Sequence, residues 1–328
     1  MLDFNKKTVL VTGASGLIGS NLTHELLNQG AIVIAMGRSL EKLKKIFDTE
    51  KDNKNLIIMT GNVSVGIQNN FPKVDFIFHA ASPISGMEIK DRPVETITAN
   101  LTGTINCLEL LRRQESGRLI VFSSATVYGN QFDKEKTVNE EETICADALD
   151  TVNAPYSESK RMIEVIARSY SKQYGIDTVI VRIAYVYGFV RPTPNTAFYE
   201  FINKAVVGEN IVLNNSGMAR RDNIHVNDVI KGLLLVALKG ENASSYNISS
   251  NGERGNYKAI DEMAEVIANV TNTIKKEAEI RVLTKTILET RKPGMKLDNS
   301  KLKKLGWSVE ISLQDGIKDT IEKFIGGQ

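Results

Sequence analysis

Three glycines spaced three residues apart, between an apolar run and an amphipathic stretch, constrain the fold of this chain most. Residues Thr8–Val11 have the pattern of a buried strand, Gly13, Gly16 and Gly19 follow, and Leu17–Asn28 has helical periodicity. In this context the first glycine permits a tight turn, the second lets the backbone approach a pyrophosphate, and the third lets helix and strand pack closely. The helix N-terminus adds amide donors and a partial positive charge. The predicted dinucleotide contacts of this turn are Gly13, Ser15, Gly16, Leu17, Ile18 and Gly19.

Further short apolar runs alternate with helical patterns along the first half of the chain. The predicted strands are Ile32–Met36, Leu56–Met59, Phe76–His79, Leu119–Phe122 and Val179–Val181. The predicted helices between them include Leu40–Phe47, Val94–Gln114 and Tyr156–Tyr174. Runs that are apolar on both faces are typical of a parallel sheet covered by helices. We therefore predict an α/β fold with a doubly wound parallel (Rossmann) sheet.

The pattern changes after residue 183, where a proline-punctuated loop precedes mixed helices and short strands. Residues 1–183 are predicted to form the dinucleotide-binding domain, and residues 184–328 mainly a smaller C-terminal α/β substrate-binding region. A helix at Val226–Leu238 and a strand at Ser245–Ile248 indicate that the chain returns to the sheet around residues 224–250.

Composition excludes several classes of function. Lys and Arg number 41 against 39 Asp and Glu, a formal net charge of +2, so we expect no nucleic-acid partner. Two cysteines, Cys107 and Cys145, provide neither a disulfide framework nor a zinc cluster, and we expect no metal. The sequence shows no signal segment and no apolar run of the ~20 residues needed to cross a membrane. These features predict a cytoplasmic protein without a membrane partner.

The end of the second predicted strand bears on the choice of cofactor. Residues Ala35–Ser39 contain no carboxylate to bind an adenosine 2′-hydroxyl, whereas Arg38 and Ser39 suit a 2′-phosphate. NADP(H) is therefore favoured and NAD(H) remains open. In the alternative interpretation, Ser39 only caps the next helix and Arg38 faces water. Further cofactor contacts are predicted after the third and fourth strands, at Asn62, Val63, Ala80 and Ala81.

A tyrosine and a lysine four residues apart on one predicted helix indicate acid–base chemistry. Tyr156 and Lys160 lie on one helix face, and Ser124 follows the strand Leu119–Phe122. Lowering a tyrosine pKa by roughly 3 units requires about 4 kcal/mol of preferential stabilisation of the phenolate. One ammonium at about 4 Å supplies roughly that much, so Lys160 is expected to lower the pKa of Tyr156. The three residues are the predicted catalytic set for hydride transfer between a nicotinamide and an alcohol or carbonyl.

Longer segments of the chain resemble those of one known family. They are Val74–Ala81, Asn100–Thr104, Ser123–Gly129, Tyr156–Lys160 and Arg221–Val226. Together they resemble the NAD-dependent epimerase/dehydratase branch of the extended short-chain dehydrogenases, over essentially the whole chain. Members of that branch mostly act on nucleotide sugars.

The resemblance implies further contacts and an assembly. Arg221 becomes the candidate that holds a substrate diphosphate, with Arg291 as a second one. Asn100 and Val186 are added to the predicted cofactor contacts. The other predicted substrate contacts are Ser82, Ser124, Ala125, Thr126 and Tyr185. Relatives pair through the helices that correspond to Val94–Gln114 and Tyr156–Tyr174, which implies a homodimer with a four-helix interface.

Departures from the family pattern narrow the chemistry. Dehydratases of the family place an Asp-Glu pair where this chain has Ala125 and Thr126, and decarboxylases keep the glutamate. Elimination and decarboxylation are therefore set aside. Epimerases commonly have Phe-Asn where this chain has Ala184-Tyr185, so Tyr185 marks a departure in substrate binding.

Three functions remain. The first is NADP(H)-dependent reduction of a nucleotide-linked 4-keto(-6-deoxy) sugar at C4, with Tyr156 as the acid/base. The alternative is a nucleotide-sugar 4-epimerase with tightly bound NAD(P) and a transient 4-keto intermediate. A binding protein that senses the dinucleotide without catalysis is the third, and the intact Ser124, Tyr156 and Lys160 argue against it.

Overall fold

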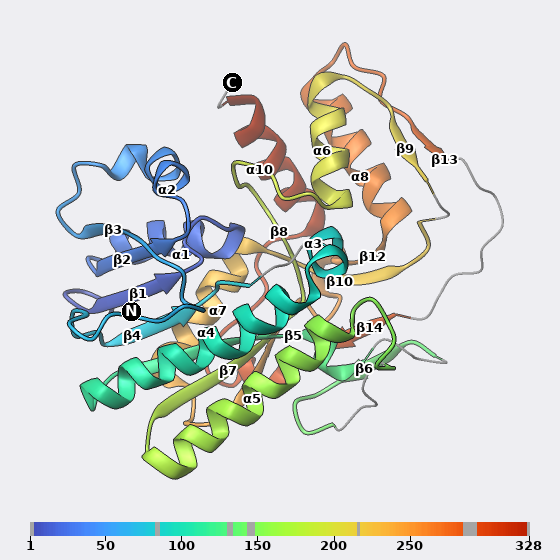
Figure 1. Ribbon diagram of the computed structural model, residues 1–328. Helices are drawn as coiled ribbons and strands as arrows, with labels where there is room; N and C mark the ends of the chain where they lie inside the picture. Colours follow the sequence, from blue (N-terminus) through green and yellow to red (C-terminus); the bar gives the residue numbers. More distant parts are fainter. Residues whose placement is uncertain are drawn as a thin grey trace.

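A seven-stranded sheet forms the centre of the protein (Figure 1). The computed structural model describes residues 3–82, 86–129, 134–142, 148–214, 217–284 and 294–326. The strand order is β11-β7-β5-β4-β1-β2-β3, and all neighbours are parallel. The strands are β1 (Thr8–Thr12), β2 (Ile32–Gly37), β3 (Leu56–Thr60), β4 (Phe76–His79), β5 (Arg118–Ser124), β7 (Asp177–Ile183) and β11 (Ser245–Ile248). The predicted doubly wound α/β fold is confirmed.

Helices cover both faces of this sheet, which explains why its strands are apolar throughout. On one face α4 (Pro93–Gln114) and α5 (Ala154–Tyr174) run side by side (Figure 1). On the other, α1 (Leu17–Asn28) packs against α7 (Val226–Lys239). In β1, Leu10 shares a core with residues of α4 and α5, whereas Val9 and Val11 share a core with residues of α1 and α7. The alternation of side chains along a strand therefore supplies both cores.

The direction in which successive strands are added changes between β1 and β4. The strands β2 and β3 lie on one side of β1, whereas β4, β5, β7 and β11 lie on the other side. In open α/β sheets, ligands bind outside the carboxyl ends of the strands at such a point. The glycine turn after β1 and the segments after β4 and β5 therefore meet at the expected binding edge.

The rest of the chain builds smaller sheets and helices beyond this edge. A three-stranded sheet has the order β12-β10-β8, made of β8 (Tyr185–Tyr187), β10 (Arg220–His225) and β12 (Tyr257–Ala259). Two parallel pairs join β9 (Ile211–Leu213) to β13 (Val282–Thr284) and β6 (Lys136–Val138) to β14 (Met295–Leu297). The helices here are α6 (Ala197–Val207), α8 (Ile260–Ile274), α9 (Ser300–Lys303) and α10 (Leu313–Gly326). The two remaining short helices are α2 (Leu40–Ile46) and α3 (Gly86–Asp91).

The chain returns to the central sheet as β11, beside β7, with α7 preceding it. The division into a dinucleotide domain and a substrate region at residue 183 stays a prediction. Within the described ranges, no helix has the length and apolar character required to cross a membrane. Over the same ranges, no group of three or more His, Cys, Asp or Glu side chains is placed to hold a metal ion.

Several elements extend beyond their predicted ends. The strand β5 continues through Ser123 and Ser124, which are buried although they are polar. Periodicity of apolar residues stops at Phe122 and misses this extension, because hydrogen bonds and not apolar packing account for the two serines. The helix α5 begins two residues before Tyr156, with a proline in its first turn, where a missing amide hydrogen costs little.

Candidate active site

A cleft of about 1470 Å³ runs along the carboxyl edge of the central sheet. Its lining brings together the glycine turn, the ends of β1, β2, β5 and β7, the segments that follow β3 and β4, the start of α5, and β8 and β10. Most predicted contacts line it: Gly13, Ser15, Gly16, Leu17, Ile18, Gly19, Arg38, Asn62, Val63, Ala80, Ala81, Ser82, Ser124, Ala125, Thr126, Tyr156, Lys160, Tyr185, Val186 and Arg221.

The three glycines of the turn are constrained by different neighbours. Gly13 has φ +67°, and a Cβ there would lie 2.7 Å from the Ala81 nitrogen. A Cβ at Gly19 would lie 2.3 Å from the Gly13 carbonyl oxygen. Gly16 is exposed, and a Cβ there would meet only that same oxygen, at 3.4 Å. The chain's own packing therefore requires glycine at 13 and 19, whereas Gly16 leaves its outer side open to a ligand in the cleft.

At the end of β2 the cleft is lined by two basic side chains and no carboxylate from the described residues. Arg38 is exposed, and Lys42, one turn into α2, lines the cleft beside it. Ser39 does not line the cleft. Its hydroxyl accepts a hydrogen bond from the Lys42 backbone N–H at 3.2 Å and caps α2. For Ser39 the capping interpretation thus matches the structure, while Arg38 faces the cleft.

The ends of β3 and β4 complete the predicted dinucleotide side. Asn62 is exposed, and its Oδ1 accepts a hydrogen bond from the Ser64 N–H at 3.1 Å, as in an ordinary turn. His79 is buried, and its Nδ1 lies 2.8 Å from the Thr12 hydroxyl. Burial and the nearby charge of Lys160 lower the pKa of His79 to about 3, so this ring is neutral and structural.

Asn100 does not reach the cleft either. It is 1% exposed on the inner face of α4, where its Nδ2 donates to the Ser159 hydroxyl at 2.8 Å. Its Oδ1 accepts a hydrogen bond from Ser82, also at 2.8 Å. Asn100 therefore supports Ser82, which lines the cleft, and links α4 to α5. Arg291 lies outside the described residues.

The predicted catalytic residues converge at the centre of the cleft. Ser124 ends β5, Tyr156 lies in the first turn of α5, and Lys160 follows one turn later. The Lys160 ammonium donates to the Phe122 carbonyl at 2.8 Å and lies 5.6 Å from the centre of the Tyr156 ring. The nearby Ser124 side chain acts to lower the pKa of the Tyr156 phenol. The structure thus brings Ser124, at the end of β5, next to Tyr156 and Lys160, which lie one turn apart on α5.

The pKa of Tyr156 is shifted in the direction opposite to the one expected from Lys160. Burial raises the pKa of Tyr156, and the hydrogen bond from Ser124 only partly offsets this effect. Burial also lowers the pKa of Lys160 to about 7. The prediction treated Lys160 as a fixed charge, but the same low-polarity surroundings disfavour both the phenolate and the ammonium. At neutral pH, Tyr156 therefore keeps its proton.

Positions 125 and 126, where the family resemblance implies carboxylates in dehydratases, hold neutral residues here, and both line the cleft. Ala125 and Thr126 form the 3₁₀ turn (Ala125–Tyr128) directly after β5. The Thr126 hydroxyl has no hydrogen-bond partner in the described part of the chain. No carboxylate stands beside Ser124 in this turn to move a proton during elimination or decarboxylation.

The opposite wall of the cleft comes from two neighbouring strands. Tyr185 and Val186 of β8 and Arg221 of β10 line it, and the two strands are parallel. The Arg221 side chain is exposed. Asp222 behind it is buried, accepts hydrogen bonds from the Ser250 hydroxyl at 2.5 Å and the Leu297 N–H at 2.9 Å, and thereby fixes β10. Burial raises the pKa of Asp222 to about 6.

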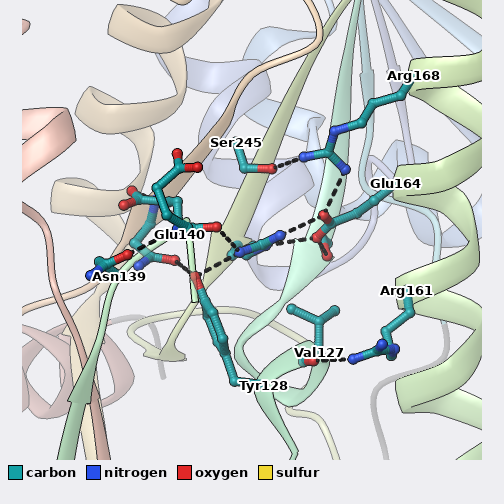
Figure 2. Close-up of polar contacts among 12 residues, drawn as sticks. Val127, Tyr128, Asn139, Glu140, Arg161, Glu164, Arg168 and Ser245 are labelled. Atoms are coloured by element: carbon teal, nitrogen blue, oxygen red, sulfur yellow. Dashed lines mark hydrogen bonds and ion pairs between the residues drawn. The ribbon is translucent and has the colours of Figure 1, made fainter. Parts of the chain in front are cut away.

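Sequence reasoning missed two features. Lys42 lies four residues after Arg38, a spacing that places them near each other at the start of a helix. Glu164 lies four residues after Lys160, on the same face of α5 as the catalytic pair. Its contacts with Ser123, Arg168 and Arg182 connect α5 to β5 and β7 and have no local sequence signature. Figure 2 shows the contact with Arg168.

The chain is similar in sequence and in fold to several known proteins. Residues 9–249 match the model of the NAD dependent epimerase/dehydratase family. UDP-glucuronic acid decarboxylase 6 of Arabidopsis thaliana is 29% identical over 326 residues, covering 96% of this chain and 88% of the relative. The structure of Bordetella bronchiseptica WbmF in complex with NAD⁺ has a TM-score of 0.74 at 26% identity, covering 97% of this chain and 92% of that one.

A second solved structure has the same fold over nearly the whole length of both chains. UDP-glucose 4-epimerase of Thermotoga maritima, solved with UDP-glucose, has a TM-score of 0.80 at 22% identity, covering 98% of this chain and 99% of that chain. The match to the family model spans well over half of the chain. The chain therefore belongs to the NAD dependent epimerase/dehydratase family and is an enzyme of the extended short-chain dehydrogenase/reductase type.

Proposed function

We propose that this enzyme exchanges a hydride at a single carbinol carbon, C4, of a nucleotide-linked sugar. The observation that carries the proposal is the convergence of Ser124, Tyr156 and Lys160 in a cleft whose neighbouring positions 125 and 126 hold no carboxylate. The set can serve one oxygen atom that alternates between alcohol and carbonyl. It offers no further acid or base beside Ser124 for loss of water or of carbon dioxide.

The chain's own residues would handle the proton and the orientation of the substrate. Tyr156, whose pKa is raised by burial, holds a proton at neutral pH that it can donate to a carbonyl oxygen. The Ser124 hydroxyl is placed to bind the same oxygen. Lys160, held by the Phe122 carbonyl, supplies positive charge near the phenol as far as it is protonated. A bound nicotinamide would supply or accept the hydride.

A nucleotide diphosphate fits the wall formed by β8 and β10. The Arg221 guanidinium is exposed in the cleft and suits two adjacent phosphate groups. The Thermotoga maritima structure was solved with UDP-glucose, and a WbmF structure was solved with NAD⁺ and UDP. These ligands support a nucleotide sugar as the substrate class. Tyr185 would then contact the sugar or the diphosphate where epimerases commonly place asparagine.

The preferred cofactor would be NADP(H). Arg38 and Lys42 line the β2 end of the cleft, where no carboxylate of the described residues competes for a phosphate. The open side of Gly16 and the helix N-terminus behind it suit the pyrophosphate. A 2′-phosphate would bring two negative charges within reach of the two basic side chains.

The first candidate reaction is reduction of a 4-keto(-6-deoxy) sugar. It uses the protonated state of Tyr156 directly, because a carbonyl that accepts a hydride also needs a proton. The basic β2 end favours the phosphorylated cofactor, which cells keep reduced for such steps.

The second candidate is a 4-epimerase that forms a 4-keto intermediate and reduces it on the other face. The Ser124–Gly129 segment resembles epimerases, and the solved 4-epimerase structure matches the chain from end to end. Such an enzyme would regenerate its cofactor in every cycle.

One experiment separates the two candidates. The purified protein is incubated with NADPH and either 4-keto or hydroxyl nucleotide sugars, and cofactor and sugar are both quantified. A reductase consumes one NADPH for each 4-hydroxyl formed and prefers NADPH to NADH. An epimerase interconverts two hydroxyl sugars without net change in cofactor. Loss of water or carbon dioxide from the sugar would contradict both.

The assembly expected from the family is a homodimer through α4 and α5. Apolar side chains that do not line the cleft are exposed on both helices: Ile97 on α4, and Met162 and Val165 on α5. These residues support a four-helix interface with a second copy. The cytoplasmic location stays a prediction.

A further inference from the structure

Successive turns of α5 hold the end of β5 at several points. Tyr156, in the first turn, lies near Ser124, which acts to lower the pKa of its phenol. Lys160, one turn later, donates to the Phe122 carbonyl at 2.8 Å. Residues four apart on a helix lie on one face, so the next residue in this row is Glu164.

Glu164 binds Ser123, which lies on β5 between Phe122 and Ser124, the contacts of Lys160 and Tyr156. The Ser123 hydroxyl donates to its Oε1 at 2.6 Å. The carboxylate also receives the Arg182 guanidinium, with Nε at 2.9 Å from Oε1 and Nη2 at 2.8 Å from Oε2. Arg168 Nη1 lies 3.1 Å from Oε2 (Figure 2). The Glu164 side chain is 5% exposed, so these bonds are made away from water.

The partners of Glu164 connect it to three neighbouring strands. Ser123 of β5 and Arg182 of β7 are directly opposite each other in the parallel pairing. Arg168, from α5 itself, donates to the Ser245 hydroxyl of β11 at 2.7 Å. The carboxylate is thus fixed to β5 and β7 directly and to β11 through Arg168.

Arg182 is itself held from its other side. Its Nη1 donates to the Tyr128 hydroxyl at 2.8 Å and to the Glu140 carbonyl at 3.0 Å. Tyr128 in turn donates to Asn247 at 2.8 Å. Figure 2 shows Tyr128 and Glu140 on the side of this cluster that faces away from α5. Since Arg182 cannot easily follow a displaced partner, any slide of α5 along the sheet breaks several charge-assisted hydrogen bonds at once.

We propose that Glu164 is a positioning residue for the proposed hydride-exchange site: it sets the axial position of α5 on β5, so that Tyr156 meets Ser124 and Lys160 reaches the Phe122 carbonyl. A helix rises about 1.5 Å per residue, so a slip of less than one residue already separates these pairs. The inference rests on the proposed function for its catalytic meaning. The contacts that carry it are independent of the identity of the substrate.

The test uses variants that each remove a different contact of Glu164. Ser123→Ala removes the hydrogen bond between Glu164 and β5 and leaves the ion pair of Glu164 with Arg182. Glu164→Gln keeps the size of the side chain and removes its charge. Arg168→Met is the matched control, because it removes a Glu164 partner that does not bind β5 or β7. Thermal unfolding is measured for each variant, so that activity is compared only below the onset of unfolding.

The first readout is the titration of the Tyr156 phenol, taken as the ultraviolet difference between each variant and the same variant carrying Tyr156→Phe. Ser123→Ala and Glu164→Gln are expected to raise the phenol pKa, because a displaced α5 moves Tyr156 away from Ser124, which acts to lower that pKa. Arg168→Met is expected to leave it unchanged. An unchanged titration in folded Ser123→Ala would overturn the inference, and so would an equal shift in Arg168→Met.

The second readout is steady-state kinetics with the substrate identified for the wild type. Ser123→Ala and Glu164→Gln should lower kcat roughly 10- to 100-fold, in line with the cost of a ~1 Å misplacement. The KM and the cofactor Kd should stay within about twofold of wild type. A kcat equal to wild type in both variants overturns the inference. If the wild type exchanges no hydride with any nucleotide sugar, the proposed function fails, while the phenol titration still decides the role of Glu164.

Discussion

At the scale of single residues, burial disfavours the charged forms of the two ionisable groups of the proposed catalytic set, Tyr156 and Lys160. Burial raises the pKa of Tyr156 and lowers that of Lys160 to about 7, so the phenol and the amine are both disfavoured in their charged forms. An active site with such a pair sacrifices stability for function. Replacing a buried ionisable residue of this pair can therefore lower the activity while it raises the free energy of unfolding, and the two effects can be measured separately.

Tyr156→Phe tests the catalytic role directly. The substitution removes only the hydroxyl that donates the proton, so kcat is expected to fall roughly 10²- to 10⁴-fold. The cofactor Kd, measured by fluorescence titration, should stay within about twofold of wild type. Full turnover in the variant would remove Tyr156 from the mechanism.

Lys160→Met is expected to abolish activity and to stabilise the fold at pH 7. The pKa of Lys160 falls from 10.5 to about 7 in the folded protein, which costs roughly 4 kcal/mol at or below pH 7. Loss of the hydrogen bond to the Phe122 carbonyl returns about 1–2 kcal/mol of that. We therefore expect the free energy of unfolding to rise by about 2 kcal/mol.

The sign of this effect depends on pH. Between about 7 and 10.5 the unfolded chain binds a proton at Lys160 that the folded protein has lost, so the stability of the wild type rises across this range relative to the variant. Denaturant unfolding of both proteins at pH 7 and pH 9.5 measures the difference. A variant no more stable than wild type at pH 7 would contradict the burial argument.

At the scale of elements, the glycine turn and the strand pattern were predictable, and the ends of elements were not. The turn between β1 and α1 has steric requirements that only glycine meets, so it leaves a clear mark in the sequence. The extension of β5 through Ser123 and Ser124 depends on partners on α5, as far as 41 residues away in the case of Ser123 and Glu164. No local pattern reports such a contact.

Local patterns and contacts between distant residues also explain which predicted site residues line the cleft and which do not. Residues at or just after the carboxyl end of a strand, such as Ser124 and Ala81, line the cleft because the carboxyl ends of parallel strands share one edge. Ser39 and Asn100 do not line it, because each satisfies a nearby hydrogen-bonding group instead. The pKa of Tyr156 was mispredicted because burial, which decides it, is a property of the assembled fold.

The turn itself gives a prediction in which two glycines differ. Gly16→Ala should keep the free energy of unfolding within about 1 kcal/mol of wild type, since a Cβ there has space, while the cofactor Kd rises at least roughly tenfold. Gly13→Ala should lose more than about 2 kcal/mol, because its φ of +67° and the 2.7 Å approach of the Ala81 nitrogen both exclude a Cβ. Denaturant unfolding and cofactor titration measure the two effects. Equal behaviour of the two variants would contradict the division of roles.

At the scale of the whole molecule, one cleft joins the central sheet to the smaller sheets. The side with Arg38 and Lys42 and the side with Arg221 belong to segments far apart in the chain, and the catalytic residues lie between them. The outer face of α4 and α5 lies across the sheet from α1 and α7. Pairing of two copies through this face would involve the same helix that carries Tyr156 and Lys160.

The expected homodimer can be tested on that face. Replacing Met162 and Val165, which are 48% and 55% exposed on α5, with Asp should halve the molar mass measured by light scattering. Val207→Asp on α6, at 65% exposure, is the matched control and should leave the mass unchanged. Wild-type protein that is already monomeric at micromolar concentration would refute the dimer.

The most direct test of the central claim follows deuterium from the cofactor. The protein is incubated with nicotinamide-deuterated NADPH and a 4-keto nucleotide sugar, and the product is analysed by mass spectrometry and NMR. The proposed chemistry predicts one deuterium at C4 of the sugar with wild-type protein, and none above background with Tyr156→Phe. Deuterium at another position, or a product that has lost water or carbon dioxide, would contradict hydride exchange at C4.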